Sequence, residues 1–158
     1  MSRLPEESVW DYPRPPAVET FIGEIRIIQN NKTIAQSQEV VRVLETSHPP
    51  NYYIPKADIE MHYLKKNPHK TICEFKGIAT YWDVDMEGYK RSLVGWSYEQ
   101  PNKDYEEITG YLSFYAGKLE ACYVNEERIQ PQPGDFYGGW ITGNIKGPFK
   151  GGPGTVGW

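Results

Sequence analysis

The chain has 158 residues, 39% of them apolar, and a formal net charge of −4, and it contains twelve tyrosines and five tryptophans. The length fits a single domain, and the acidic balance argues against a nucleic-acid partner. The first residues lack the apolar core of a secretion signal, and no run approaches the ~18 apolar residues of a membrane span. We therefore expect a cytoplasmic protein with neither a nucleic-acid nor a membrane partner.

Residues 1–20 are rich in proline and charge, and we expect them to form an extended arm. The prolines between Trp10 and Pro16 remove backbone donors that a central strand or a helix interior would need. The rings of Trp10 and Tyr12 are expected to dock on the body of the protein. The alternative interpretation is a disordered terminus.

Residues 21–129 are expected to form the core domain, because they consist almost wholly of strand signals. Short alternating or apolar runs recur at the ~8–12-residue spacing of all-β folds, bounded by Asn, Gly or Pro. The expected strands are residues 24–28, 32–35, 40–44, 51–55, 59–64, 70–85, 89–98, 111–115 and 119–124. Only residues 103–109 indicate a helix, capped by Asn102 and ended by Gly110. The pattern predicts a mainly-β fold of two antiparallel sheets with one short helix.

Residues 130–158 combine proline, glycine and aromatic residues with little periodicity. We expect this segment to be an ordered strap packed on the core through rings such as Trp140, and partial mobility is the alternative. The aromatic residues of both terminal segments are also candidates for a homo-oligomer contact.

The two cysteines and three histidines do not have the spacing of a metal site. Structural zinc sites use closely paired ligands, whereas Cys73 and Cys122 lie far apart in the sequence. In a reducing compartment these cysteines are expected to be free thiols. We expect neither a metal nor a cofactor.

The loop Glu45-Thr-Ser-His48 places a carboxylate and an imidazole directly after an apolar strand. Glu45 and His48 are candidate catalytic residues, because such a pair can act as general acid and base, with Ser47 as a hydroxyl partner. The alternative is structural, since Thr and Ser before two prolines often close a turn through side-chain hydrogen bonds.

A lysine and several large rings gather on two neighbouring strands. Side chains two apart in a strand face the same side, so Trp96 and Tyr98 share one face, and Lys76 and Trp82 share another unless a bulge occurs at Gly77. Pairing of these strands would form an aromatic-lined pocket with a cation at its rim, which suits planar or anionic small molecules. The alternative is an aromatic core, although lysine is rare in cores and glycine permits close backbone approach.

The motifs in this region resemble the family known as domain of unknown function 427. The resemblance covers residues 24–124 and extends over several motifs in the same order. These motifs include Arg42-Val-Leu-Glu-Thr-Ser, Pro50-Asn-Tyr-Tyr-Ile-Pro55, Cys73-Glu-Phe-Lys-Gly-Ile-Ala-Thr-Tyr-Trp82 and Gly95-Trp-Ser-Tyr98.

The resemblance implies a β-tent fold, in which two antiparallel sheets meet at a steep angle. Related β-tent proteins include methionine sulfoxide reductases of one class and a thalidomide-binding domain whose pocket is an aromatic cage. Many of them hold zinc with four cysteines, which this chain lacks. An alternative family label implies nucleotidyl transfer. That chemistry needs clustered carboxylates, for which only Asp83 and Asp85 are candidates, and they are more simply explained as turn residues.

The sequence therefore predicts a domain that binds a small molecule in an aromatic-lined pocket. In this hypothesis Trp82 and Trp96 are stacking walls, Lys76 meets an anionic or carbonyl group, and Glu45 accepts a hydrogen bond or holds the lysine. The alternative is an enzyme, a hydrolase or transferase, that uses Glu45 and His48 in the same pocket. The expected ligand-binding residues are Glu45, His48, Lys76, Tyr81, Trp82, Trp96 and Tyr98.

Overall fold

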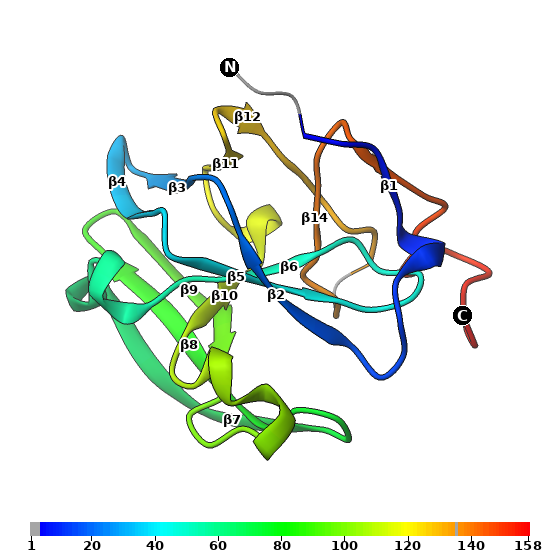
Figure 1. Cartoon of the computed structure of the whole chain (residues 1–158). Coiled ribbons are helices and arrows are strands. Elements are labelled where there is room, and N and C mark those ends of the chain that lie inside the picture. The colour runs from blue at the N-terminus through cyan, green and yellow to red at the C-terminus, as the bar shows by residue number, and fades with distance from the viewer. Residues whose placement is uncertain (1–3, 135) are drawn as a thin grey trace.

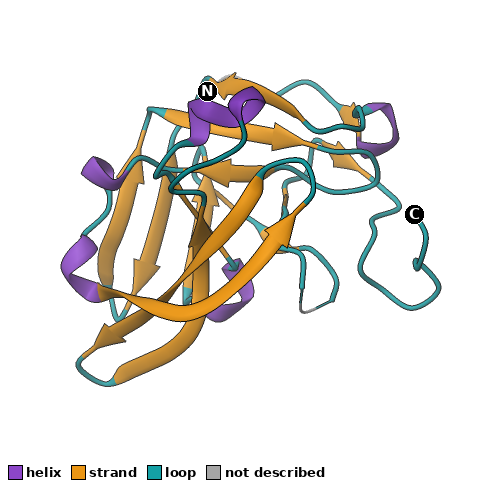
Figure 2. Ribbon diagram, turned by 90° about the horizontal axis from the view of Figure 1, so that it is seen from below, coloured by secondary structure: helices purple, strands orange, loops and turns teal. Residues whose placement is uncertain are grey.

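A computed structural model of the protein describes residues 4–134 and 136–158 (Figures 1 and 2). The mainly-β class is confirmed, since antiparallel sheets form the body of the molecule. The described residues contain no α-helix, only five short 3-10 segments, and none of these is long and apolar enough to cross a membrane. The helix expected at residues 103–109 is the 3-10 segment Lys103–Ile108, which is kinked at Tyr105.

Three sheets of three or four strands replace the two that the sequence predicted. One contains β12 (Glu127–Arg128), β11 (Ala121–Val124), β3 (Ile25–Gln29) and β4 (Lys32–Ser37), in that order. A second contains β2 (Ala17–Phe21), β5 (Val40–Leu44) and β6 (Asn51–Tyr53). Asn30 and Asn31, both with positive φ, form the two-residue turn between β3 and β4.

The third sheet is the longest and carries the site. It has the order β10 (Leu112–Phe114), β9 (Tyr89–Ser97), β8 (Gly77–Met86) and β7 (Leu64–Cys73). The expected strand at residues 70–85 is interrupted by a turn at residues 74–76, so it contributes to both β7 and β8. The strand expected at residues 59–64 is mostly the 3-10 segment Met61–Tyr63. The strands expected at residues 111–115 and 119–124 belong to different sheets, as β10 and β11.

Alternation along the strands separates two apolar clusters. In β6, Tyr52 enters the main core, whereas its neighbour Tyr53 enters a second, smaller cluster. In β8, Trp82 faces the main core and Tyr81 faces the second cluster. Successive strand side chains point to opposite faces, so each pair of adjacent aromatic residues serves both faces of its sheet.

A bulge in β9 interrupts its pairing with β8. The register of β8 against β9 shifts between Trp82 and Val84, next to Leu93, whose φ is 56°. The Asp83 carboxylate accepts a hydrogen bond from the Leu93 backbone N–H at 2.8 Å. Beyond the bulge, Trp96 lies opposite Tyr81 in the register, on the face away from the main core.

The N-terminal segment is held by a buried ion network. Arg42 is 5% exposed and contacts both oxygens of Glu7 at 3.2 Å and one oxygen of Glu19 at 2.5 Å. The Tyr12 hydroxyl donates to Glu7 at 2.6 Å. Strand β1 (Glu7–Ser8) then pairs in parallel with β15 (Ile145–Lys146), which brings the two terminal segments together on one side of the molecule (Figure 1). The extended part ends where β2 begins, at Ala17.

The C-terminal segment packs on the core through Trp140 in β14 (Trp140–Ile141), which pairs with β13 (Gln130–Pro131). Trp140 is 1% exposed, and its indole N–H donates to the Phe114 carbonyl at 2.9 Å. The two preceding residues must be glycine. A Cβ on Gly138 would lie 2.3 Å from the Trp96 ring, and one on Gly139 would lie 2.5 Å from the Pro49 carbonyl oxygen.

Replacing Trp140 by alanine is expected to lower the free energy of unfolding by about 3–5 kcal/mol, because the change leaves a large cavity and an unpaired carbonyl. Denaturant titration would measure this loss. Phe136→Ala is the matched control, since Phe136 lies in the same segment but is 63% exposed. A loss from Trp140→Ala no larger than that of the control would show that the segment does not depend on Trp140 for its packing.

Candidate functional site

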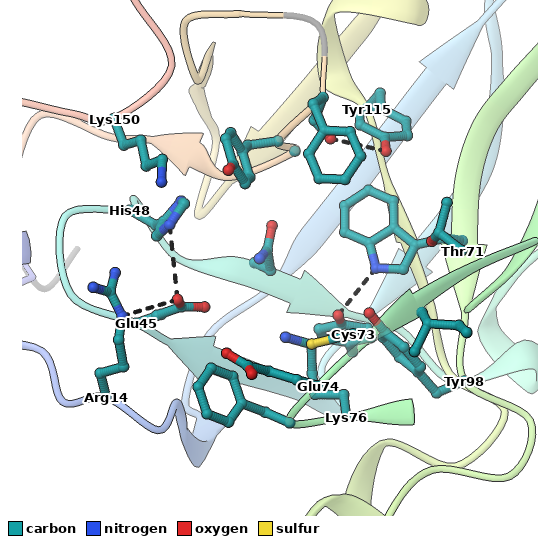
Figure 3. A pocket seen from close by; sticks show the side chains of 18 of the residues that line it. Arg14, Glu45, His48, Thr71, Cys73, Glu74, Lys76, Tyr98, Tyr115 and Lys150 are labelled. Atoms are coloured by element: carbon teal, nitrogen blue, oxygen red, sulfur yellow. Dashed lines mark hydrogen bonds and ion pairs between the residues drawn. The ribbon is translucent and has the colours of Figure 1, made fainter. Parts of the chain in front are cut away.

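A cavity of about 390 Å³ lies on the face of the β7–β10 sheet that points away from the main core. It is lined by the N-terminal arm, the loop after β5, β6, the β7–β8 turn and the C-terminal segment. In the view of Figure 3, Arg14, Glu45 and His48 lie toward one end, and Tyr98 and Tyr115 toward the other. The site therefore combines a charged end with an aromatic end.

The aromatic end is built from rings that hold each other in place. Tyr53 of β6 packs edge-on against Trp96 of β9, with ring centroids 6.3 Å apart, and its hydroxyl accepts a hydrogen bond from the Trp96 indole at 3.1 Å. Tyr115 lies against the other side of Trp96, with centroids 4.7 Å apart. The Tyr81 hydroxyl pairs with the Thr71 hydroxyl at 2.9 Å. These contacts hold the rings of the cavity wall in place.

Tyr98 offers a neutral hydroxyl to the cavity. Its ring lies 6.5 Å from the ring of Tyr53, and burial raises the pKa of both hydroxyls above the ordinary range, so each keeps its proton. Nothing among residues 4–134 and 136–158 hydrogen-bonds the Tyr98 hydroxyl. That hydroxyl can donate to a ligand or accept from one.

Lys76 reaches the cavity from the tight turn between β7 and β8. Gly77, with φ 113°, supplies the left-handed backbone that ends the turn. Asn102 fixes the turn from outside, donating its backbone N–H to the Lys76 carbonyl and its amide to the Phe75 carbonyl, both at 2.8 Å. The Lys76 ammonium lies 5.8 Å from the centroid of the Tyr98 ring. This turn thus presents a cation beside an aromatic face.

Lys76 is a buried cation without a compensating carboxylate. The residue is only 7% exposed, yet no Asp or Glu of the described chain lies within 4.0 Å of its ammonium. Glu45 does not hold Lys76 as expected, because its carboxylate pairs with Arg14 at 3.2 Å. Burial of an unpaired charge is costly, which makes Lys76 the most unusual group of the cavity.

His48 is fixed in one neutral form by Gln132. The Gly139 backbone N–H donates to the Gln132 side-chain oxygen at 3.0 Å, so the amide nitrogen of Gln132 faces the other way. That nitrogen donates to the Lys150 carbonyl at 2.8 Å and lies 3.0 Å from His48 Nδ1. His48 Nδ1 must therefore accept, and the proton of the imidazole lies on Nε2, which is 3.9 Å from Glu45.

The pKa of His48 agrees with this neutral form. Burial is the main cause that lowers it to about 4, and Lys150, Arg14 and Lys76 lower it further, whereas Glu45 acts in the opposite direction. Near neutral pH the imidazole therefore presents Nε2–H as a donor and has no free lone pair.

Trp82 does not line the cavity, contrary to the sequence-based expectation. The other six expected ligand-binding residues do, namely Glu45, His48, Lys76, Tyr81, Trp96 and Tyr98. Lys76 belongs to a turn and precedes β8, so its position cannot be extrapolated along that strand to Trp82. The Trp82 indole instead donates to the Ser97 hydroxyl at 2.9 Å on the core side.

The carboxylates suggested by the alternative family label do not form a pair. Asp83 accepts from Asn67 and from the Leu93 backbone, and Asp85 contacts Lys65 at 2.6 Å. The described part of the chain contains no group of three His, Cys, Asp or Glu side chains that could hold a metal ion. Cys73, at the cavity wall, and Cys122, in the core, are free thiols.

Sequence reasoning missed several residues of the site. Tyr53 could have been found, because it alternates with Tyr52 in a predicted strand. Arg14, Gln132 and Lys150 could not, because they lie in segments without periodicity and reach the cavity only through the docking of both termini.

The fold and the cavity define a β domain with a ligand-sized, aromatic-walled site. Residues 17–125 match the family labelled NTP_transf_9 and described as a domain of unknown function, DUF427. This match covers well over half of the chain, so the protein belongs to the DUF427 family, as its motifs indicated. A comparison with curated proteins found no match.

Acidification from pH 6.5 to pH 4 is expected to destabilise the protein through His48. The pKa of His48 is about 4 when folded and ~6.5 in an unfolded chain, so the unfolded state binds the proton first. The stability that depends on neutral His48 is complete above pH 6.5 and falls by up to about 3 kcal/mol as the pH approaches 4. Urea unfolding at a series of pH values would measure the slope.

His48→Asn removes the titrating group and should flatten this part of the profile. His62→Asn is the control, because His62 is exposed and its replacement should preserve the wild-type slope. If the stability of His48→Asn fell with pH as steeply as that of wild type, the pH dependence could not be assigned to His48.

Proposed function

We propose that the protein binds a small organic molecule in the cavity between Tyr98, Trp96 and the charged end. The observation that carries this proposal is Lys76, a cation that is 7% exposed, lies in an aromatic-walled cavity and has no carboxylate partner within the described chain. A ligand with a hydrogen-bond acceptor would take the place of the missing carboxylate, because such an acceptor offsets the cost of burying the Lys76 charge.

The dimensions and walls of the cavity support this proposal. Its volume of about 390 Å³ falls within the range of small-molecule sites. The face of Trp96 is held by Tyr53 and Tyr115, so a planar ligand would meet a surface that is already ordered. Binding to such a preformed wall costs little conformational entropy.

The geometry favours binding over general acid and base catalysis by Glu45 and His48. A general base needs a free lone pair, but Nδ1 of His48 accepts from Gln132 and Nε2 carries the proton. The Glu45 carboxylate is paired with Arg14. His48 is thus suited to donate a hydrogen bond to a ligand.

The proposal places this binding in the cytoplasm, where Cys73 and Cys122 remain reduced. A homo-oligomer contact through the terminal aromatic residues is a separate expectation, for which Phe136 and Trp10 offer the exposed rings. Size-exclusion chromatography of wild type and a Phe136→Ala, Trp10→Ala double variant tests it, since an unchanged monomer in both counts against the contact.

Tryptophan fluorescence during a metabolite screen tests the binding proposal. A compound that enters the cavity should quench wild type and Trp82→Phe, but it should quench Trp96→Phe much less. The two tryptophans are matched, because each is 6% exposed and each donates one indole hydrogen bond, on opposite faces of the same sheet.

Native mass spectrometry of the freshly purified protein provides the independent readout. A retained small-molecule mass that Trp96→Phe weakens would support the site. The proposal fails if no mass is retained and no compound in the screen changes the fluorescence of the wild type.

A further inference from the structure

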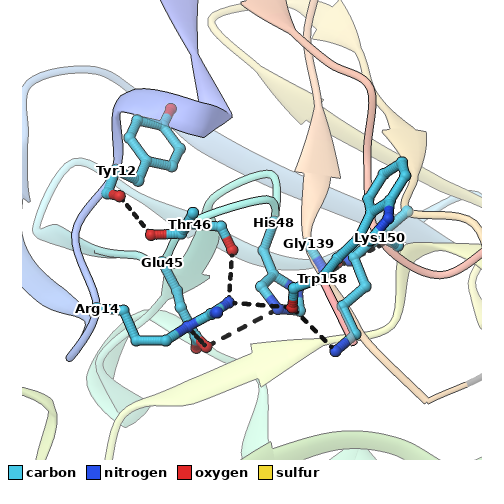
Figure 4. A network of polar contacts seen from close by, with 9 residues as sticks. Tyr12, Arg14, Glu45, Thr46, His48, Gly139, Lys150 and Trp158 are labelled. Carbon is cyan, nitrogen blue, oxygen red and sulfur yellow. Dashed lines mark hydrogen bonds and ion pairs between the residues drawn. The ribbon is translucent and has the colours of Figure 1, made fainter. Parts of the chain in front are cut away.

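The charged end of the cavity carries more positive than negative charge. We call the charged side chains of Arg14, Lys76 and Lys150, together with the neutral His48, the cationic pole. All four residues line the cavity, and Arg14 and Lys150 lie close to His48 in Figures 3 and 4, while the Lys76 ammonium lies beside the Tyr98 ring. Among the described residues of the cavity wall the acids are Glu45 and Glu74, and Glu45 is paired with Arg14 at 3.2 Å. The other acid of the cavity wall, Glu74, is exposed to solvent.

A main-chain oxygen of the protein itself occupies this pole. The Trp158 oxygen accepts from the Arg14 guanidinium at 3.5 Å and from the Lys150 ammonium at 3.3 Å (Figure 4). Both contacts are longer than the ~2.9 Å of an ordinary N–H···O bond. The oxygen is therefore held loosely by two groups that bind oxygen anions well.

The Trp158 segment rests on few other contacts. The Trp158 ring packs against Trp10, with centroids 5.3 Å apart, and its backbone N–H donates to the Thr155 carbonyl. The neighbouring Val156 is 98% exposed. The buried Thr155 holds the start of this segment through hydrogen bonds of its hydroxyl to Gly151 and Gly152, so that only the residues after Thr155 would need to move.

We propose that the cationic pole binds an oxyanion, a carboxylate or a phosphate, of a planar aromatic ligand, and that this oxyanion takes the place of the Trp158 main-chain oxygen. The proposal rests on the proposed small-molecule function and names its ligand class. The ring of the ligand would lie against Trp96 and Tyr98, and the oxyanion would face Lys76, Lys150 and the Nε2–H of His48.

An oxyanion fits better than a neutral group for two reasons. Lys76 is buried without a carboxylate partner, and a charged acceptor interacts with a buried ammonium far more strongly than a neutral one does. The neutral form of His48 adds a directional donor at the same place, because Gln132 fixes its proton on Nε2. A cationic ligand would instead meet three like charges.

The test uses one ring with three head groups: 2-naphthoate, 2-naphthyl phosphate and the neutral 2-naphthamide. Isothermal titration calorimetry on the full chain should find at least one of the two anions bound about tenfold or more tightly than the amide. Lys76→Met and Lys150→Met should each remove most of this preference while leaving amide affinity within about threefold. Lys90→Met is the control, because Lys90 lies at the far end of β9 with its side chain 78% exposed.

The outcomes distinguish a failure of the oxyanion preference from a failure of small-molecule binding. Equal affinity for anions and amide overturns the oxyanion pole, but it leaves small-molecule binding intact. Absence of binding by all three probes also overturns the assigned ligand class, whereas the metabolite screen alone decides the broader function. Whichever of the two anions binds with the higher affinity shows whether the pole prefers a carboxylate or a phosphate.

A separate experiment tests the displacement of the Trp158 main-chain oxygen. Trp158→Ala removes the packing on Trp10 and should raise affinity for the preferred anion about three- to tenfold, because the pole is then open more of the time. Affinity for 2-naphthamide should change less. Val156→Ala in the same segment is the control and should match wild type. Unchanged or weaker anion binding by Trp158→Ala would overturn displacement.

Discussion

The alternation of side chains across β8 and β9 is the constraint from which the site follows. One face of this sheet closes the main core with residues such as Trp82, and the other carries Tyr81 and Trp96 into the cavity. The bulge at Leu93 preserves this division, because it shifts the register by two residues and so leaves Trp96 opposite Tyr81 on the cavity face. A sheet with two apolar faces needs cover on both sides, and on the cavity side β5, β6, the segment Lys103–Ile108 and the chain ends together provide it.

The two terminal segments are therefore part of the site. Gln132 uses its oxygen and both amide hydrogens to join Gly139, the Lys150 carbonyl and His48. A fully satisfied buried network of this kind is rigid and specific. Through it the C-terminal segment sets the tautomer of a histidine in a distant loop. Arg14 completes the arrangement from the N-terminal arm by neutralising Glu45.

Two buried cations, Arg42 and Lys76, have very different surroundings. Arg42 is met by two carboxylates, Glu7 and Glu19, and anchors the N-terminal arm. Lys76 is buried to a similar degree, but within the described chain its ammonium has the ring of Tyr98 and no carboxylate beside it. The same chain compensates one charge fully and, within the described residues, leaves the other without a carboxylate, and this contrast is what supports the proposed oxyanion ligand.

The sequence by itself determined the β class, most strand positions, the family and six of the cavity residues, because strand periodicity and local motifs are properties of short segments. It could not place Trp82, since the turn at Lys76 ends one strand and begins another, so counting residues across it does not preserve the face. Only the tertiary structure decided that Arg14 and Lys150 meet His48. These residues are separated by most of the chain, and their meeting depends on the docking of both termini, for which no local pattern exists.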